Sequence, residues 1–177
     1  MIEKLVKRNK IYNGSIIDVF CDKVKLSNGF ITSREYLSHP GAAAVLPFLD
    51  KKNIVLVKQY RYPINQITYE IPAGKIDKSE NPFECALREL EEETGYKVKK
   101  MKKLLLFHPT VAFSTELIYI YVAFGLEKGM KKTDNDEFVE QKVLNFNSAI
   151  KMVKSGKITD AKTIIALLYM ENILKRS

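Results

Sequence analysis

The spacing of apolar residues predicts a strand-rich first part of the chain. Along residues 11–37 apolar and polar positions alternate around two Asn-Gly pairs, which favour hairpin turns. Residues 41–62 hold two apolar runs on either side of the polar segment 50–53, and residues 67–74 read as a short strand broken by Pro72. This pattern predicts N-terminal antiparallel strands followed by further strands of a sheet.

Helical periodicity appears first in residues 82–94 and returns near the end of the chain. Between these helices, residues 102–129 predict two strands around a polar loop at 108–116. Residues 142–156 pass from a strand into a helix, and residues 160–176 predict a closing helix. Strands interleaved with two or three helices indicate the α+β class.

The helix expected at 82–94 carries an unusual crowd of carboxylates. Its start is marked by Asn81, Pro82 and a capping-box acid at Glu84, and Gly95 marks its stop. Helical spacing predicts one inward stripe and a separate acidic face. The stripe is Phe83, Ala86, Leu87, Leu90 and Thr94, and the acidic face is Glu89, Glu92 and Glu93. Two explanations fit the acidic face: a solvated surface, or a site for a hard divalent cation such as Mg²⁺.

Composition and charge restrict the class of protein. The chain has 177 residues and a net charge of +8, so general acidity does not explain the carboxylate cluster. No run of about 18 apolar residues predicts a membrane span, and no secretory signal is recognisable at the N-terminus. Two distant cysteines, Cys21 and Cys85, fit a reduced cytoplasmic setting. The scattered lysines favour a lysine-rich surface over a polyanion-binding role, and make a nucleic-acid partner unlikely.

The stretch from Gly74 to Tyr96 resembles the Nudix box, G-x5-E-x7-R-E-U-x-E-E-x-G-U, where U is a bulky aliphatic residue. Eight positions match, and Tyr96 is a bulky replacement at the last one. The matches are Gly74, Glu80, Arg88, Glu89, Leu90, Glu92, Glu93 and Gly95. The resemblance implies a Nudix hydrolase, with an α/β/α sandwich around a mixed sheet, preceded here by N-terminal antiparallel strands.

The resemblance also implies roles for residues in and near the box. The metal, Mg²⁺ with Mn²⁺ as a possible substitute, would be held by Glu89, Glu93 and the Ala73 carbonyl, with Glu92 acting directly or through water. Glu92 and Glu93 are thereby assigned to catalysis as well. Gly74 is expected to permit a tight turn. A salt bridge between Arg88 and Glu80 is expected to brace the box, and Glu91 is expected in solvent.

The flanking segments resemble the ADP-ribose pyrophosphatase branch of the family over nearly the whole chain. In that branch the implied substrate contacts are Arg34 and Glu35 at the nucleotide end, Arg61 at a phosphate, Glu70 at a sugar or base edge, and Glu116. Asp134 and Asp136 match the acids that orient the attacking water, with Glu137 and Glu140 as alternatives. The loop departs from the branch pattern, because Val111 and Ala112 replace the usual Pro-Gly.

The resemblance further implies a homodimer, formed through the N-terminal strands at 1–40 and followed by a Nudix domain at 41–177. The expected reaction is Mg²⁺-dependent hydrolysis of the pyrophosphate bond of ADP-ribose or a related nucleoside diphosphate sugar, giving a nucleoside monophosphate and a sugar phosphate. Two alternatives stay open at this point. One is a Nudix enzyme acting on a dinucleotide or an RNA 5′ end, and the other is a non-catalytic Nudix ligand-binding module.

Overall fold

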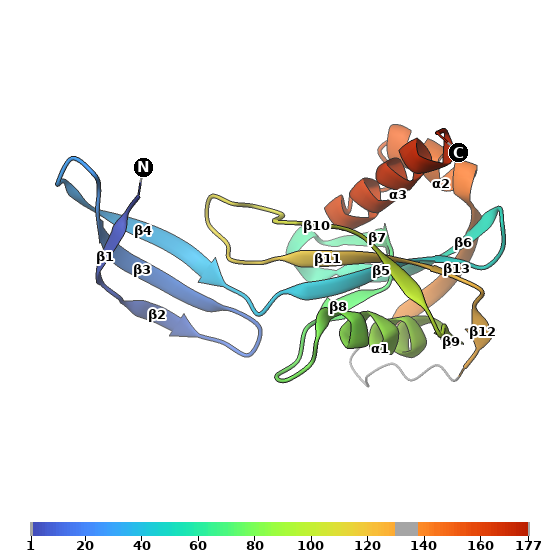
Figure 1. Ribbon diagram of the computed structural model, residues 1–177, viewed down its shortest axis with the longest axis horizontal. Helices are drawn as coiled ribbons and strands as arrows, with labels where there is room; N and C mark the ends of the chain where they lie inside the picture. The colour runs from blue at the N-terminus through green and yellow to red at the C-terminus, as the bar shows by residue number, and fades with distance from the viewer. Residues whose placement is uncertain (1, 130–137, 177) are drawn as a thin grey trace. The chain divides into compact units, whose positions relative to one another are not determined.

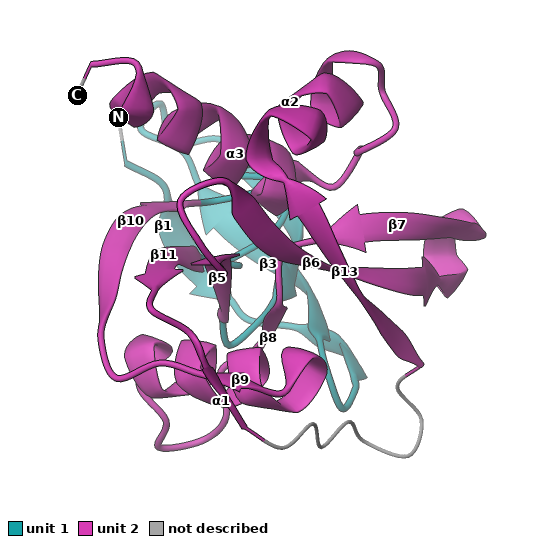
Figure 2. Cartoon of the chain, turned by 90° about the vertical axis from the view of Figure 1, so that its right-hand side faces the viewer, with its two compact units in different colours: residues 1–41, 108–117 teal, residues 42–107, 118–177 magenta. Residues whose placement is uncertain are grey.

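The computed structural model describes residues 2–129 and 138–176, which form two compact units. Unit 1 comprises residues 1–41 and 108–117, and unit 2 comprises residues 42–107 and 118–177 (Figure 2). The loop 108–117, which sequence analysis places in the larger domain, therefore clusters with the N-terminal strands. Two backbone hydrogen bonds explain this: the Leu37 N–H donates to the Phe113 carbonyl (2.8 Å) and the Thr115 N–H donates to the Leu37 carbonyl (3.0 Å).

Unit 1 is built on a four-stranded antiparallel sheet. Its strands are β1 (Lys4–Lys7), β2 (Lys10–Asn13), β3 (Asp18–Lys25) and β4 (Ile31–Ser38). The hairpins expected at the two Asn-Gly pairs are present: the β3–β4 turn contains Gly29 at φ 89°, and residues 14–17 connect β2 to β3. Positive φ at Gly29 is a conformation that side chains disfavour, which accounts for glycine there.

Unit 2 is a seven-stranded mixed sheet with helices on both faces (Figure 1). Its strands are β5 (Ala42–Phe48), β6 (Asn53–Arg61), β7 (Gln66–Glu70), β8 (Ala73–Lys75), β10 (Met101–Phe107), β11 (Ile118–Phe124) and β13 (Val139–Asn145). The helices are α1 (Pro82–Thr94), α2 (Phe146–Lys154) and α3 (Ala161–Leu174). A short 3-10 helix, η1 (Tyr62–Ile64), follows β6, and β9 (Tyr96–Lys97) pairs with β12 (Glu127–Lys128). The α+β class and the mixed sheet agree with the sequence prediction.

Two hydrophobic clusters cover the two faces of the unit 2 sheet. One packs α1 against the central strands through Cys85, Ala86 and Leu90, and Tyr96 packs on its edge. The other packs α2 and α3 on the opposite face. Burial from both sides explains the continuous apolar sequence of β5 and of the first half of β6.

A split in the sheet positions the candidate site. Strands β5 and β6 pair only at Phe48 and Ile54, next to their hairpin. Farther along, β8 pairs with β5 and β7 pairs with β6. The two residues between β7 and β8 therefore cross from one strand to the other, and the Pro72 carbonyl accepts a bond from the Val45 N–H (2.9 Å). This crossing is the strand break predicted at Pro72.

Candidate active site

Helix α1 begins and ends at the residues that sequence analysis identified. The Asn81 side chain accepts hydrogen bonds from the Phe83 and Glu84 N–H groups (both 3.0 Å), and Glu84 accepts the Asn81 N–H (3.2 Å). This is a complete capping box, with Pro82 in the first turn. Gly95 ends the helix at φ 70°, a left-handed conformation that suits glycine.

The carboxylates of α1 do not form a separate solvated face. Glu89 and Glu93 are 8% and 3% exposed, so they belong to the buried stripe together with Leu90 and Thr94. The predicted apolar stripe is buried or half-buried at every position, but the buried side of the helix also includes two acids that were expected on a separate face. Acids are buried on this side because the helix lies against β8 as well as against apolar strands, and a backbone N–H of β8 donates to one of the carboxylates. Two buried acids one helical turn apart exclude the explanation of a simple solvated surface for this pair.

Strand β8 touches these carboxylates directly. The Ala73 N–H donates to Glu93 Oε2 at 3.2 Å. A Cβ atom built on Gly74 would lie 1.7 Å from Glu89 Oε1, well inside any van der Waals contact. Gly74 pairs with Ala43 inside the sheet and has no positive φ, so the tight-turn role expected from the sequence is wrong. Glycine is needed there because the Glu89 carboxylate approaches the strand backbone.

Arg88 is the cation of the cluster. Its Nε and Nη2 donate to the two Glu80 oxygens (2.8 and 3.0 Å), which confirms the expected salt bridge. Its Nη1 donates to Glu89 Oε1 (2.6 Å) and Glu92 Oε2 (2.9 Å). The bonds from Arg88 lower the pKa of Glu80 to about 2. One guanidinium thus serves three carboxylates, which leaves the surface of α1 beside β8 with excess negative charge.

The donors at this surface suit a hard divalent cation. Carboxylate oxygens of Glu89 and Glu93, together with the Ala73 carbonyl of the adjoining strand, are the ligand type that Mg²⁺ prefers. Within residues 2–129 and 138–176, no three His, Cys, Asp or Glu side chains already stand in a metal-binding cluster. Arg88 holds Glu89 and Glu92 instead. The residues fit a metal once Glu89 and Glu92 are released from the guanidinium.

Two neighbours of the cluster have roles other than metal binding. Glu91 is partly exposed and pairs with Lys97 (3.0 Å), so it is less solvated than expected. Cys85 is fully buried in the core under α1. Burial, aided by the charges of Glu80 and Glu89, raises the pKa of the thiol to about 12. This thiol is therefore a packing group, as expected, and is too weakly ionised to be a nucleophile at neutral pH.

A second ionic cluster stands at the end of β7. Arg61 Nε and Nη2 donate to the two oxygens of Glu70, both at 2.7 Å, and Thr68 Oγ1 donates to Glu70 Oε1 at 2.6 Å. Lys162 Nζ also donates to Glu70 Oε2. Glu70 is 2% exposed. Burial opposes its ionisation, but the hydrogen bonds from Arg61 and the charge of Lys162 outweigh that effect and lower its pKa to about 2.

The family resemblance placed Arg61 and Glu70 at the substrate but gave no role to two residues that complete their ionic cluster. Lys162 and its neighbour Asp160 lie in the segment GKITDAKTIIALL, which carried part of the family resemblance without an assigned role. Asp160 caps α3 by accepting the Thr163 N–H (3.0 Å), and it also accepts from Lys162 Nζ (3.0 Å). The only sequence signal was an N-cap residue followed by a lysine in the first helical turn.

Apart from an alternative acid on β13, the remaining expected site residues lie outside unit 2 or outside the described ranges. Arg34 and Glu35 are exposed neighbours on β4, so their side chains leave opposite faces of that sheet. Arg34 pairs with Glu3 (2.6 Å). Glu116 is half-buried in the loop 108–117, where its carbonyl oxygen accepts a bond from His108 Nδ1 (2.8 Å), a structural role for that histidine. Asp134, Asp136 and Glu137 lie outside the described residues. Their alternative Glu140 is exposed on β13 and pairs with Lys58 and Lys142.

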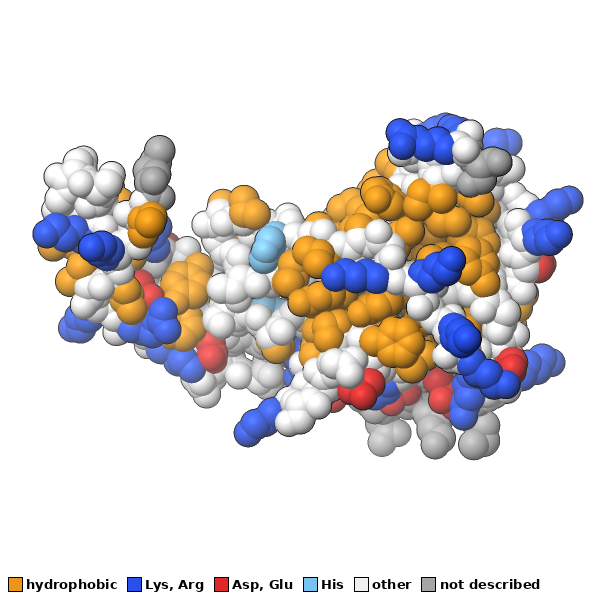
Figure 3. Space-filling model, viewed as in Figure 1, with side chains coloured by type: hydrophobic (Ala, Val, Ile, Leu, Met, Phe, Trp, Pro, Cys, Tyr) orange, Lys and Arg blue, Asp and Glu red, His pale blue; other side chains and the backbone are white. Residues whose placement is uncertain are grey.

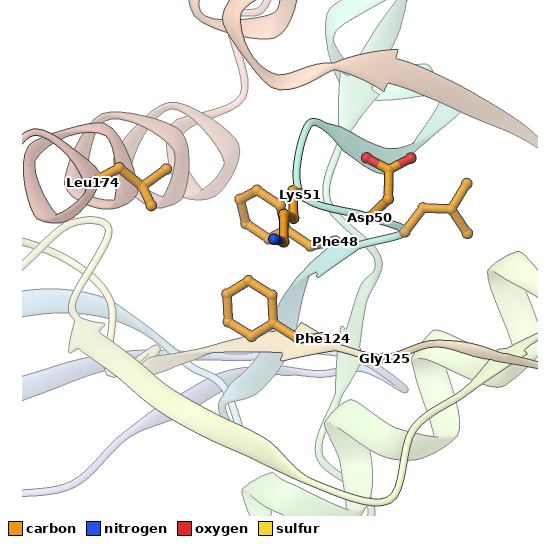
Figure 4. A pocket seen from close by; sticks show the side chains of 7 residues that line it. Phe48, Asp50, Lys51, Phe124, Gly125 and Leu174 are labelled. Carbon is orange, nitrogen blue, oxygen red and sulfur yellow. The ribbon is translucent and has the colours of Figure 1, made fainter. Parts of the chain in front are cut away.

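A cavity of about 540 Å³ lies elsewhere in unit 2, and none of the expected site residues lines it (Figure 4). It opens at the carboxyl ends of β5 and β11, whereas β8 and α1 meet β5 at its other end. The Phe48 and Phe124 rings stack at 5.0 Å in its wall. The Asp50 carboxylate is directed into its own turn, where it accepts the N–H groups of Lys52 and Asn53.

The chain is similar in sequence to one protein family and to curated bacterial proteins, and similar in fold to a solved structure. The NUDIX domain family matches residues 38–167. An ADP-ribose pyrophosphatase of Bacillus subtilis (strain 168) is 41% identical over 171 residues, which are 96% of this chain and 92% of that protein. A methanol dehydrogenase activator of Bacillus methanolicus is 42% identical with the same coverage. A crystal structure of an ADP compounds hydrolase superposes with a TM-score of 0.86 at 19% identity, over 99% of this chain and 95% of that one.

Proposed function

Because the chain belongs to the NUDIX domain family, we propose that it hydrolyses the pyrophosphate bond of a nucleoside diphosphate sugar. The products are a nucleoside monophosphate and a sugar phosphate, and ADP-ribose is the first substrate to test. The family match confirms the family predicted from the box. The observation that carries the proposal is the pair of buried carboxylates, Glu89 and Glu93, held against the backbone of β8.

Divalent-metal dependence is general among Nudix pyrophosphatases, and Mg²⁺ is the ion proposed here, with Mn²⁺ as a substitute. Glu89, Glu93 and the Ala73 carbonyl would hold it, and Glu92 would join them directly or through water. When bound, Mg²⁺ neutralises pyrophosphate charge and acidifies a bound water. Arg88 supports this site by fixing Glu80 and by balancing part of the carboxylate charge before the metal arrives.

Arg61 is proposed to bind a substrate phosphate. Its planar donors match two phosphate oxygens as they match the two oxygens of Glu70 in this structure. The bonds to Glu70 raise the pKa of Arg61, with a smaller contribution from the charge of Glu93. Arg61 therefore lies within electrostatic reach of the proposed metal-binding acid. Glu70 stays a proposed sugar or base contact, which requires one of its present bonds to be exchanged.

The other proposed substrate contacts come from unit 1 and from outside the described residues. Arg34, Glu35 and Glu116 are proposed to contact the substrate, and Asp134 or Asp136 to orient the attacking water. Such a carboxylate accepts a proton from the water as the water attacks. Its removal should therefore lower kcat more than it raises KM. Comparing Asp134→Asn with Asp136→Asn assigns this role, since only one of the two should show that pattern.

A homodimer is proposed as the working form. Strands β1 and β2 are exposed at every position, and they carry apolar side chains there: Leu5 (53%), Val6 (54%), Ile11 (62%) and Tyr12 (58%). Hydrophobic side chains also gather on one face of unit 2 (Figure 3). Apolar surface of this extent is typical of a face that a partner covers, and the proposed partner is a second copy of the chain.

The dimer proposal predicts that removing residues 1–40 abolishes dimerisation and weakens substrate binding. The deletion also takes away the backbone partners of the loop 108–117, so a milder variant is needed. Replacing Leu5 and Ile11 by Lys leaves that loop intact and should produce monomers as well. Light scattering at micromolar concentration gives the mass, and a fully active monomer contradicts the proposal.

A cytoplasmic location is proposed because Cys21 and Cys85 are both free thiols. No helix in the described part of the chain is long and apolar enough to cross a membrane.

The reaction itself is tested by a turnover screen with purified protein and Mg²⁺. ADP-ribose, other nucleotide sugars, dinucleotides and 5′-triphosphorylated RNA are offered at moderate salt, and the products are separated by chromatography. The proposal expects a nucleotide sugar to give the highest kcat/KM. Faster turnover of a dinucleotide or of the RNA end would show that the substrate belongs to that class instead. Binding of a compound without turnover of any compound offered would indicate a ligand-binding module.

A further inference from the structure

We propose that Lys162 is a positioning residue that allows Arg61 to leave Glu70 and bind the substrate phosphate. The inference rests on the proposed function of Arg61. It adds a residue on α3 to the expected site residues that unit 2 places on β6, β7, β8 and α1. It also explains why two cations stand on one buried carboxylate.

The bonds to Glu70 show what remains when Arg61 departs. Each Glu70 oxygen has two donors: Oε1 accepts from Arg61 and Thr68, and Oε2 accepts from Arg61 and Lys162. If Arg61 leaves, Oε1 keeps the Thr68 hydroxyl and Oε2 keeps the Lys162 ammonium. Without Lys162, departure of Arg61 would leave Oε2 with no donor and a buried anion with no cation, which is strongly unfavourable.

The two cations differ in how firmly they are held. Arg61 is the last residue of β6, and its side chain is 41% exposed. The Lys162 side chain is 12% exposed and lies in the first turn of α3, between Glu70 and Asp160. Arg61 is therefore the partner that can move toward a ligand, and Lys162 is the partner that stays.

The anchor of Lys162 is itself part of the frame of the site. Thr163 Oγ1 donates to Asp160 (2.6 Å) and accepts the Ile71 N–H (2.8 Å), so the start of α3 is bonded to the crossing between β7 and β8. Thr163 is completely buried. Two residues after Ile71, the Ala73 N–H donates to Glu93. The same short segment thus fixes Lys162 on one side and a proposed metal ligand on the other.

Substitution of Lys162 by Met should therefore lock Arg61 on Glu70. We expect KM for ADP-ribose to rise by roughly tenfold or more, while kcat stays within about threefold, because the lost interaction is one of binding. Lys162→Arg keeps the charge and should retain most of the affinity. Lys175→Met is the matched control, because it removes a lysine that pairs with Glu171 on the exposed end of the same helix.

A double substitution separates this role from simple structural support. If the defect of Lys162→Met comes from Arg61 being held, then adding Glu70→Gln removes the charge that holds it. The double variant should recover KM to within about threefold of Glu70→Gln alone. Damage to packing around α3 would not be repaired by a second change, so additive effects in this cycle would overturn the proposal.

The movement of Arg61 can be observed without catalysis. Protein labelled with ¹⁵N-arginine gives an Nε–H resonance for Arg61, identified by its loss in Arg61→Lys. Titration with inorganic pyrophosphate should shift this resonance in the wild type and in Lys175→Met, and Lys162→Met should need at least about ten times more pyrophosphate. An unmoved resonance in the wild type, or an equal response in Lys162→Met, overturns the proposal. A normal response in a protein that hydrolyses no nucleotide sugar would remove the proposed function and leave this inference standing.

Discussion

The two ionic clusters of unit 2 use the same kinds of side chain in opposite proportions. In the cluster on α1, one guanidinium is shared by three carboxylates, with a further buried carboxylate at Glu93. In the cluster at the end of β7, two cations meet Glu70 and Asp160, so charge is balanced. The excess of negative charge suits the first cluster to take up a cation. The balance in the second suits it to release one of its cations to an anionic ligand.

The largest expected effect comes from removing a carboxylate of the first cluster. Glu93→Gln keeps the size of the side chain but removes a proposed metal ligand, so kcat should fall by more than the roughly 10–100-fold that loss of an outer-shell partner causes. Glu91→Gln is the matched control, because Glu91 is on the same helix, pairs with Lys97 and is not a proposed metal ligand. Steady-state kinetics and thermal melting are measured together. Equal activity in the two folded variants would contradict the assignment of the metal site.

A smaller effect is expected from Gly74→Ala. The added Cβ would meet the Glu89 carboxylate, which must then move away from β8. Metal affinity should fall by about 10–100-fold, as for changes that displace a ligand without removing it. Calorimetric titration with Mn²⁺ measures this affinity directly. Unchanged Mn²⁺ binding in Gly74→Ala would show that the position of Glu89 against the strand is unimportant for the metal.

A substitution in the second cluster should change the free energy of unfolding more than it changes metal binding. The pKa of Glu70 is lowered from 4.5 to about 2 in the folded chain. Its stabilising contribution is therefore complete above about pH 4.5 and disappears as the pH falls toward 2. Glu70→Gln should lower the free energy of unfolding at pH 7 by on the order of 1–3 kcal/mol. The difference from the wild type should shrink below pH 4.5.

Urea unfolding between pH 3 and pH 7 checks this expectation. Glu127→Gln serves as the control, because the Glu127 carboxylate also pairs with a lysine, Lys99, but its side chain is 62% exposed instead of buried. A wild type and a Glu70→Gln variant that differ by the same amount at every pH would show that the ionisation of Glu70 does not contribute to folding.

The same contrast shows what could be predicted from sequence. The capping box and the helix stop at Gly95 depend on spacing along one helix, so the local sequence was enough to predict them. The Arg88–Glu80 bridge also joins residues close in sequence, and it was predicted from the resemblance to the box. The role of Gly74 was misassigned, because the approach of Glu89 depends on how the helix packs on the strand. The Lys162–Glu70 pair joins residues 92 positions apart, and no local pattern encodes that contact.

The same reason explains two other differences. The loop 108–117 joins unit 1 through hydrogen bonds to Leu37, a contact that depends on tertiary structure. The buried stripe of α1 includes Glu89 and Glu93, because the adjoining strand offers backbone groups that a rule based on apolar residues does not consider. Periodicity predicted where the helix lies, and packing decided which polar residues it buries.

Product analysis in ¹⁸O-labelled water tests the central claim most directly. Purified protein with Mg²⁺ is incubated with ADP-ribose, and the phosphorylated products are examined by mass spectrometry. Attack of water on the pyrophosphate predicts one ¹⁸O atom in either AMP or ribose 5-phosphate, with no free orthophosphate. Release of orthophosphate from a simple phosphate monoester, with ADP-ribose left intact, would contradict the account.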